Sequence, residues 1–154
     1  MLKMKVGQAI VETLLLEGVG HVFGVVGSAT LEVMDAMYGR NDIRFVGCRC
    51  AQGAGFMALG YARAKGQAGV CIAQNGPGVT NLVTNAAAAL VCHTPMVIIG
   101  GASMTGQMYR DSFQELDQLG IFRPVCKAVL QINRPERAPE LLRDAFRVAT
   151  SGKM

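Results

Sequence analysis

The 154-residue sequence predicts an α/β fold, a doubly wound and mostly parallel sheet of six strands with helices on both faces. Helical and extended stretches alternate along the chain, as such a fold requires. The extended stretches are rich in Val and Ile without polar alternation, which is typical of parallel strands covered on both faces. A hydrophobic content of 51% and a mean hydropathy of +0.30 suffice for one core, so residues 1–154 are expected to form one domain.

The elements follow from the spacing of apolar residues. Helical spacing predicts a first helix from Met4 to Glu17, and a short apolar run predicts a strand from His21 to Val25. We expect Ser28 to cap the next helix. The remaining expected elements are helix Ala29 to Tyr38, strand Ile43 to Gly47, helix Gln52 to Ala64, strand Gly69 to Ala73, helix Gly78 to Val91, strand Met96 to Ile99, a short helix near Gln114 to Leu119, strand Val125 to Ile132 and helix Glu136 to Thr150.

The charge pattern indicates which partners the chain has. The net charge of +4 comes from scattered basic residues without interleaved aromatics, so we expect no nucleic-acid partner. No Asp, Glu, Lys or Arg occurs from Gly66 to Tyr109, but polar residues such as Asn75 and His93 interrupt this stretch, so we expect no membrane span. The helical part from Val79 to Val91 is small or apolar on nearly every face, which predicts a partner surface and at least a dimer.

Five cysteines, an odd number, lie mostly in apolar runs. They form no CxxC pair and have no histidine at zinc spacing, so we expect buried free thiols in a cytoplasmic protein and no metal-binding residue. A redox role for Cys48 and Cys50, two positions apart at a strand end, is the alternative. The N-terminal apolar stretch contains Gln8 and Glu12 at helical spacing and therefore indicates a surface helix rather than a leader.

Four strand-to-helix junctions are the candidate site, because ligands of open α/β sheets bind at the carboxyl ends of the strands. Glycines in Gly24 to Ser28 permit close backbone approach. Arg49 to Ala51 carries no acid and no imidazole where such a site usually places its chemistry. Gln74 to Gly78 contains a proline suited to a first helical turn, and Asp111 to Glu115 precedes the short helix.

These junctions resemble, in order and spacing, the N-terminal pyrimidine-binding domain of the thiamine diphosphate enzymes. Members that look nearest are acetolactate synthase, glyoxylate carboligase and sulfoacetaldehyde acetyltransferase, and Ile72 to Gly78 with His93 to Pro95 favours the last. The resemblance covers nearly the whole chain. It is carried by Gly24 to Ser28, Arg49 with Ala54, Gly60 to Gly66, Asn75 to Asn81, Phe113 to Glu115 and Phe122 to Val125.

The resemblance implies that thiamine diphosphate binds across an interface. This domain would hold the aminopyrimidine, while a separate domain, usually of another subunit, holds the diphosphate and magnesium. That domain carries a Gly-Asp-Gly motif, and this chain has none, so a second chain carrying the diphosphate-binding domain is expected. The helix from Val79 to Val91 would face the partner.

The resemblance also implies residue roles. Ala51 would lie beside the ring nitrogen, where most members carry the glutamate of Arg-His-Glu, whose hydrogen bond to the pyrimidine lets the ring's amino group take the thiazolium proton. A methyl group cannot relay a proton, although glyoxylate carboligase has valine there and still works. Gln114 would orient a carbonyl or carboxylate. The pyrimidine pocket would comprise Asn75, Pro77, Gly78 and Asn81, and Gly27, Ser28 and Phe113 would face the substrate.

Several alternative interpretations of these residues and of the chain's function stay open. Asn81 and Asn85 could pair with backbone groups, and Phe113 could belong to the core. The chain could be one subunit of a split enzyme that decarboxylates or ligates 2-oxo acids or aldehydes, a non-catalytic scaffold or regulatory relative, or a piece of a longer enzyme, since the family usually continues into a middle domain. A dinucleotide-binding Rossmann domain is not supported, because GxGxxG and an acid after the second strand are both missing.

Overall fold

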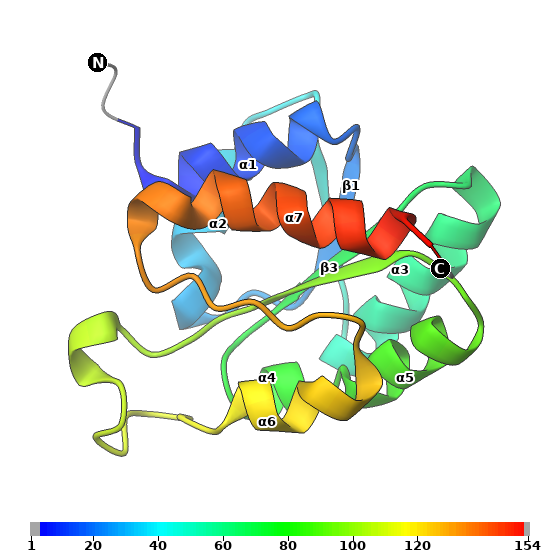
Figure 1. Cartoon of the computed structure of the whole chain (residues 1–154). Helices are drawn as coiled ribbons and strands as arrows, with labels where there is room; N and C mark the ends of the chain where they lie inside the picture. Colours follow the sequence, from blue (N-terminus) through cyan, green and yellow to red (C-terminus); the bar gives the residue numbers. More distant parts are fainter. Residues whose placement is uncertain (1–3, 153–154) are drawn as a thin grey trace.

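The computed structural model describes residues 4–152 and shows an α/β fold in which helices flank a sheet (Figure 1). Residues 1–3 and 153–154 of the expected domain lie outside the described part. In chain order the elements are α1 Val6–Leu16, β1 His21–Gly24, the 3₁₀ helix η1 Ser28–Thr30, α2 Leu31–Met37, β2 Arg44–Gly47, α3 Ala51–Lys65, β3 Gly69–Ala73, α4 Pro77–Thr80, α5 Val83–Val91, β4 Met96–Gly100, η2 Thr105–Gln107, α6 Gln118–Phe122, η3 Arg123–Val125, η4 Pro135–Arg137 and α7 Ala138–Thr150.

The sheet of the described residues has four strands in the order β2-β1-β3-β4, and every neighbouring pair is parallel. Phe23 on β1 lies opposite Val46 on one side and Cys71 on the other. The predicted α/β class and parallel sheet are confirmed. The predicted count of six strands is not, because only four strands form in this part of the chain.

Two hydrophobic clusters cover the two faces of the sheet, which is the doubly wound arrangement. Side chains alternate along β3, so that Val70 and Ile72 join one cluster while Cys71 and Ala73 join the other. The first cluster includes residues of α1, α2 and α7, and the second includes residues of α3, α4 and α5. Figure 1 shows α1 and α7 on one side of the strands and α3 to α6 on the other.

Glycine brings the central strands and α3 close together. A Cβ on Gly24 would lie 2.5 Å from the carbonyl oxygen of Ile72 in the neighbouring strand. A Cβ on Gly69 would lie 2.2 Å from the carbonyl oxygen of Ala58 in α3. Since no side chain fits at either place, these two residues allow the tight packing of β1, β3 and α3.

The segment from Val125 to Ile132 is not a strand, which corrects one prediction. Val125 ends η3, and residues 126–132 run as irregular chain. No backbone hydrogen bond between main-chain groups involves residues 126–132 in the described structure. An apolar run becomes a strand only when its backbone pairs with a neighbouring strand, and this segment makes no such pairing.

Three helix predictions also need correction. The short helix expected near Gln114 to Leu119 begins later, at Gln118 of α6. The helix expected from Gly78 to Val91 is divided into α4 and α5. Between them the amide of Leu82 donates to the carbonyl oxygen of Val79, three residues earlier, which forms a 3₁₀-type turn. Ser28 is not a cap but the first residue of η1, and Gly27 takes the cap position.

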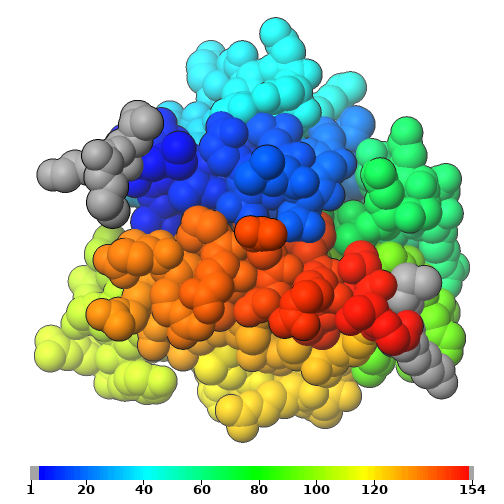
Figure 2. All heavy atoms as spheres, turned by 45° about the horizontal axis from the view of Figure 1, so that its top comes forward, coloured from blue at the N-terminus to red at the C-terminus, as the bar shows by residue number. Residues whose placement is uncertain are grey.

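A cavity of about 620 Å³ lies between β4 and the irregular residues 126–132. Its walls come from β4, α5, α6, α7, the long loop after β4 and the segment 126–132, including Ile98, Leu142 and Val129. Figure 2 shows α7, in orange to red, packed between the blue N-terminal region and the yellow segment around residue 120. The helix α7 covers this side of the sheet. Among the described residues, no strand lies beyond β4.

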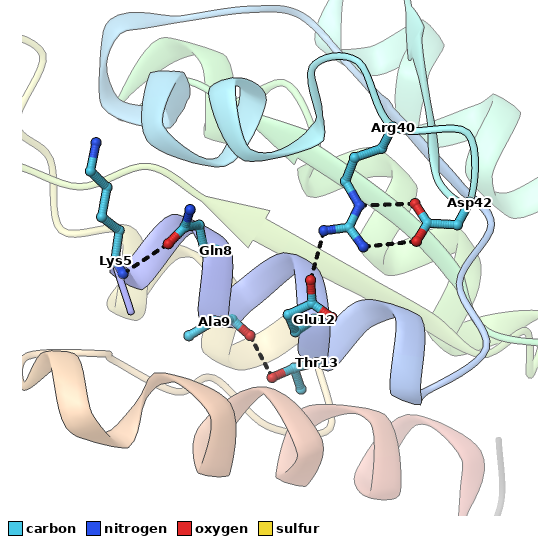
Figure 3. A network of polar contacts seen from close by, with 7 residues as sticks. All are labelled: Lys5, Gln8, Ala9, Glu12, Thr13, Arg40 and Asp42. Atoms are coloured by element: carbon cyan, nitrogen blue, oxygen red, sulfur yellow. Dashed lines mark hydrogen bonds and ion pairs between the residues drawn. The ribbon is translucent and has the colours of Figure 1, made fainter. Parts of the chain in front are cut away.

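Arg40 ties α1 to the turn before β2 (Figure 3). Its guanidinium donates to Glu12 Oε1 at 2.6 Å and to both carboxylate oxygens of Asp42, at 2.9 and 2.7 Å. The hydrogen bond from Arg40 is the main cause that holds the pKa of Asp42 below its usual value. This exposed network belongs to the scaffold, because its residues lie before β2 and not at the carboxyl ends of the strands.

Candidate functional site

The carboxyl ends of the four parallel strands share one edge of the sheet, and the loops that follow them form the candidate site. The loop after β3 begins with Gln74, and the loop after β4 extends over residues 101–117. In Figure 1 this long loop, coloured green to yellow, swings out from the sheet and returns to α6 beside α4. Chain segments far apart in sequence therefore meet at this edge.

Gln74 lies at the centre of a polar network at this edge. Its Oε1 accepts a hydrogen bond from the amide of Ala29 at 2.8 Å. Its Nε2 donates to Ser28 Oγ at 3.1 Å and to Gln114 Oε1 at 3.3 Å, and also to Oδ1 of Asn75. The side chain of Gln74 thus joins the loops after β1, β3 and β4.

Asn75 and Gln118 hold the long loop on the sheet. Asn75 is buried, and its Nδ2 donates to the carbonyl oxygen of Phe113 at 2.9 Å. Gln118 accepts from the amide of Gly76 at 2.6 Å and donates to the carbonyl oxygen of Gly101 at 2.9 Å. Each of these carboxamides uses a donor and an acceptor at once, so removing Gln118 leaves two backbone groups unpaired, and removing Asn75 leaves the Phe113 carbonyl and the Gln74 side chain without this partner.

The end of the long loop turns sharply through positive φ angles. Tyr109, Asp111 and Gln114 have φ of 63°, 52° and 57°. Glu115 accepts from the amide of Tyr109 at 2.7 Å and from that of Ser112 at 3.1 Å. These two backbone hydrogen bonds lower the pKa of Glu115, so its ionised carboxylate secures the turn that presents Gln114.

The loop after β3 needs glycine where it passes the long loop. Gly76 has φ 58°, and a Cβ there would lie 2.1 Å from the carbonyl oxygen of Gln114. An L side chain at this position would both strain the backbone and push the long loop away. Close contact between the two loops therefore depends on Gly76.

The start of α3 is apolar and carries no acid. Ala51, the first residue of α3, is 6% exposed and belongs to the cluster that contains Phe23 and Val79. The thiol of Cys50 caps the helix, accepting from the amide of Gly53 at 3.3 Å. No acidic residue occurs in the first turn of α3. This end of the site can offer apolar contact but no carboxyl group.

The structure brings together only part of the predicted site. Ser28, Asn75 and Gln114 share the network, with Gly27 and Phe113 as their chain neighbours. Phe113 is 77% exposed, so it is not a core residue. No hydrogen bond in residues 4–152 joins the remaining predicted residues to this network through their side chains; they are Ala51, Pro77, Gly78 and Asn81.

Sequence reasoning gave no role to Gln74, although it lies in the predicted junction Gln74 to Gly78, and it missed Gln118. Gln74 stands directly before Asn75 at the end of a buried strand, and that position was the available signal. Gln118 had no such signal, because its role depends on where the long loop returns to the sheet. In the part of the chain that the structure describes, no group of three His, Cys, Asp or Glu residues could hold a metal ion.

The comparisons with known proteins agree with this architecture. The family described as thiamine pyrophosphate enzyme, N-terminal TPP binding domain, matches residues 4–121. The probable acetolactate synthase large subunit of Methanocaldococcus jannaschii is 43% identical over 97% of this chain and 25% of its own length. The acetolactate synthase large subunit of Corynebacterium glutamicum is 42% identical over 98% and 24%, respectively. Acetolactate synthase isozyme 2 large subunit of Escherichia coli is 41% identical over 97% and 27%.

The match covers most of the chain, while the chain spans about a quarter of the length of these curated relatives. Of the segments on which the predicted resemblance rests, those from Gly24 to Glu115 fall within the matched residues, and Phe122 to Val125 lies just beyond them. The resemblance is therefore confirmed. The chain belongs to the thiamine pyrophosphate enzyme family, in the part that forms its N-terminal TPP-binding domain.

Proposed function

We propose that the chain is the pyrimidine-binding part of a thiamine diphosphate-dependent enzyme that decarboxylates or ligates 2-oxo acids or aldehydes. The observation that carries this proposal is the family match over residues 4–121, a range that contains every residue predicted for the site. The relatives named as acetolactate synthase large subunits support carbon–carbon bond chemistry next to a carbonyl group. The likeness of Ile72 to Gly78 and His93 to Pro95 to sulfoacetaldehyde acetyltransferase stays a prediction from the sequence.

The residues after β3 suit a flat aminopyrimidine ring. Pro77 in α4 and Asn81, which directly follows α4, are exposed, and Gly78 leaves the backbone between them without a side chain. A planar ring can approach such a backbone closely, and Asn81 can pair with its polar edge. Asn75, which precedes these residues, donates a hydrogen bond to the carbonyl oxygen of Phe113 and so links them to the long loop. When bound, thiamine diphosphate would supply an electron sink for the reacting bond.

A second polypeptide segment would hold the diphosphate and its magnesium. The described residues offer no cluster suited to a cation, whereas the relatives are about four times as long as this chain. We propose that this segment belongs to a second chain in an oligomer.

All five cysteines are free, which supports a reducing, cytoplasmic setting. None of the described helices is long and apolar enough to cross a membrane.

Ala51 supplies no acid or base at the start of α3, where the ring would be activated. A carboxyl group at the start of α3 could relay a proton through the ring, but the buried methyl group of Ala51 can neither give nor take one. The residues therefore fit the binding of the ring better than its activation. This mismatch favours the second candidate function, a non-catalytic scaffold or regulatory relative that kept the cofactor-binding architecture.

A native mass spectrum of the protein purified untagged from its source tests the proposal. We expect an assembly that contains a chain with the diphosphate-binding half-site and bound thiamine diphosphate. Substrate screening of that assembly with 2-oxo acids and aldehydes would then give the reaction. A stable assembly that takes up no thiamine diphosphate, even when magnesium and cofactor are added, would instead support the scaffold.

Substitution of Ala51 by glutamate tests its placement. In the cofactor-loaded assembly, Ala51→Glu should raise the exchange rate of the thiazolium proton at least about a hundredfold, the low end of what a positioned acid or base contributes. Gln52→Glu is the matched control, because it adds the same charge one residue further along α3 on an exposed position. Equal exchange in the loaded wild type and Ala51→Glu assemblies would contradict the placement.

A further inference from the structure

The cavity between β4 and residues 126–132 is far larger than the gaps that packing leaves in a folded core. It measures about 620 Å³, whereas protein interiors hold few voids bigger than a water molecule. Every residue of β4 and every residue of 126–132 lines it, so these two segments are its long walls. We call this cavity the slot.

Both long walls of the slot have unpaired backbone groups. Among the described residues β4 pairs only with β3, so the amides and carbonyls on its other side have no strand partner. Residues 126–132 make no main-chain hydrogen bond in the described structure, although their sequence is typical of a strand. A small apolar molecule has too few polar groups to satisfy two such rows, whereas a polypeptide strand pairs with both.

The body of the slot is uncharged. Its lining residues on β4, α5 and α7 carry no charge, and Leu142 and Ala145 are among those on α7. Its charged lining residues lie in the long loop and at one position of the opposite wall; they are Asp111, Glu115, Asp117 and Lys127. The ammonium group of Lys127 is already held by the carbonyl oxygen of Ser151 at 2.6 Å. An uncharged, apolar strand therefore suits the slot.

One buried hydroxyl in the wall of the slot has no partner. Ser103 follows β4 in the long loop, and its Oγ is buried without a hydrogen bond in the described structure. A strand beside β4 would bring backbone donors and acceptors to this end of the slot, where they could satisfy such a group. The slot thus meets the loop that carries part of the candidate site.

We propose that the second chain of the assembly inserts an extended apolar strand into the slot, where the strand pairs with β4 on one side and with residues 126–132 on the other. The strand matches β4 in length, five residues, and is buried on both faces as β3 is. This inference rests on the proposed function, which supplies the second chain. A second copy of this chain is a poorer donor, because the four strands of its described residues already pair in its own sheet.

Hydrogen exchange of the native assembly, compared with that of the isolated chain, tests the inference. In the assembly the amides of 126–132 and the slot-facing amides of β4 should exchange at least about a hundredfold more slowly. The amides of β3, paired on both sides in either sample, report that the core is intact. A second chain that leaves both walls exchanging as in the isolated chain would overturn the inference alone. Protected walls in an assembly that takes up no thiamine diphosphate would overturn the proposed function alone.

A peptide probe tests the strand itself on the isolated chain. The probe is acetyl-Lys-Gly-Val-Val-Ile-Val-Gly-Lys-amide, and its control carries N-methyl groups on alternate apolar residues, which removes the donors along one edge. We expect the probe to raise the unfolding temperature and the control to bind at least about tenfold more weakly, because it lacks two hydrogen bonds. A probe that does not bind, or that binds no better than its control, would overturn the inference.

Two proline variants test the opposite wall. Ala128→Pro and Val129→Pro each remove one amide that bonds no main-chain group in the described structure, so neither should change the unfolding temperature of the isolated chain much. Successive amides of a strand point to opposite sides, so one variant should weaken binding of the probe and the other should not. Wild-type affinity in both variants would overturn the pairing of the inserted strand with 126–132.

Discussion

The neighbouring strands β3 and β4 have equal length and similar apolar sequences but very different surroundings. All five residues of β3 are buried, whereas on β4 only Val97 is. On the inner side β3 pairs with β1, while the outer side of β4 borders the cavity and residues 126–132. The comparison shows that apolar sequence decides which segments can become core strands, and neighbouring elements decide which of them are buried.

Hydrogen exchange should show the largest contrast between the two regions. The amides of β3 lie in a strand paired on both sides, so they should exchange only through global unfolding. The amides of residues 126–132 make no hydrogen bond in the described structure and should exchange at least about a thousandfold faster, as expected from typical domain stabilities. Mass spectrometry of pepsin fragments measures both rates. Protection of 126–132 equal to that of β3 would show that this segment is paired in solution.

Truncation of matched isoleucines should give the next largest effect. Ile72 on β3 is 1% exposed and belongs to the main cluster, so Ile72→Ala should lower the free energy of unfolding by about 3 to 4 kcal/mol. Ile98 on β4 is only partly buried and already lines the cavity, so Ile98→Ala should cost about 1 to 2 kcal/mol. Urea unfolding followed by circular dichroism measures both. Equal losses would mean that β4 is packed as tightly as β3 in solution.

The same contrast explains how far the sequence predicts this fold. The four observed strands lie within one residue or so of their predicted limits, because runs such as Gly69 to Ala73 are apolar, β-rich and bounded by polar or glycine residues. The run from Val125 to Ile132 has the same character but makes no main-chain hydrogen bond, although β4 is an edge strand beside it. Strand pairing is a property of two segments, so a pattern in one of them cannot establish it.

The candidate site shows a similar limit. Ser28, Asn75 and Gln114, which share one network, could be predicted because residue types at strand ends carry local signals and because the family resemblance aligned them. The roles of Gln74 and Gln118 depend on the path of the loop 101–117, whose turns include three positive φ angles that no helix prediction foresees. Gln114 was expected at the start of a helix and lies instead in one of these turns.

Enlarging one alanine on each side should give smaller effects of opposite sign. Ala54 on α3 is fully buried in the second cluster, so Ala54→Leu overfills it and should cost about 1 to 3 kcal/mol. Ala145 on α7 lines the cavity, so Ala145→Leu has room and should stabilise the chain by about 0.5 to 1 kcal/mol. Thermal unfolding of the two variants and the wild type measures the signs. A loss in Ala145→Leu would mean that the cavity is already filled in solution.

Thiol titration should show the smallest contrast, between Cys71 on β3 and Cys126 beside the cavity. Burial raises the pKa of both thiols, to about 11 for Cys126 and further for Cys71. At pH 8 iodoacetamide should modify the exposed Cys50 and Cys92 first and Cys126 slowly, while Cys71 should react only on unfolding. The rate at Cys126 should rise steadily toward pH 11 as its thiolate forms. Peptide mass spectrometry resolves the sites.

The same shifts predict how stability depends on pH. Because a folded-state pKa above the ordinary thiol value of 9.0 keeps the proton on the folded chain, the stabilisation from the neutral thiols is complete below pH 9 and is lost as the pH rises toward 11. Cys126→Ala removes one of these titrations, so its urea midpoint should fall less between pH 9 and pH 10.5 than that of the wild type. Cys92→Ala, at an exposed position, should follow the wild type. Identical pH curves for Cys126→Ala and the wild type would place Cys126 in contact with water and the cavity beside it open to solvent.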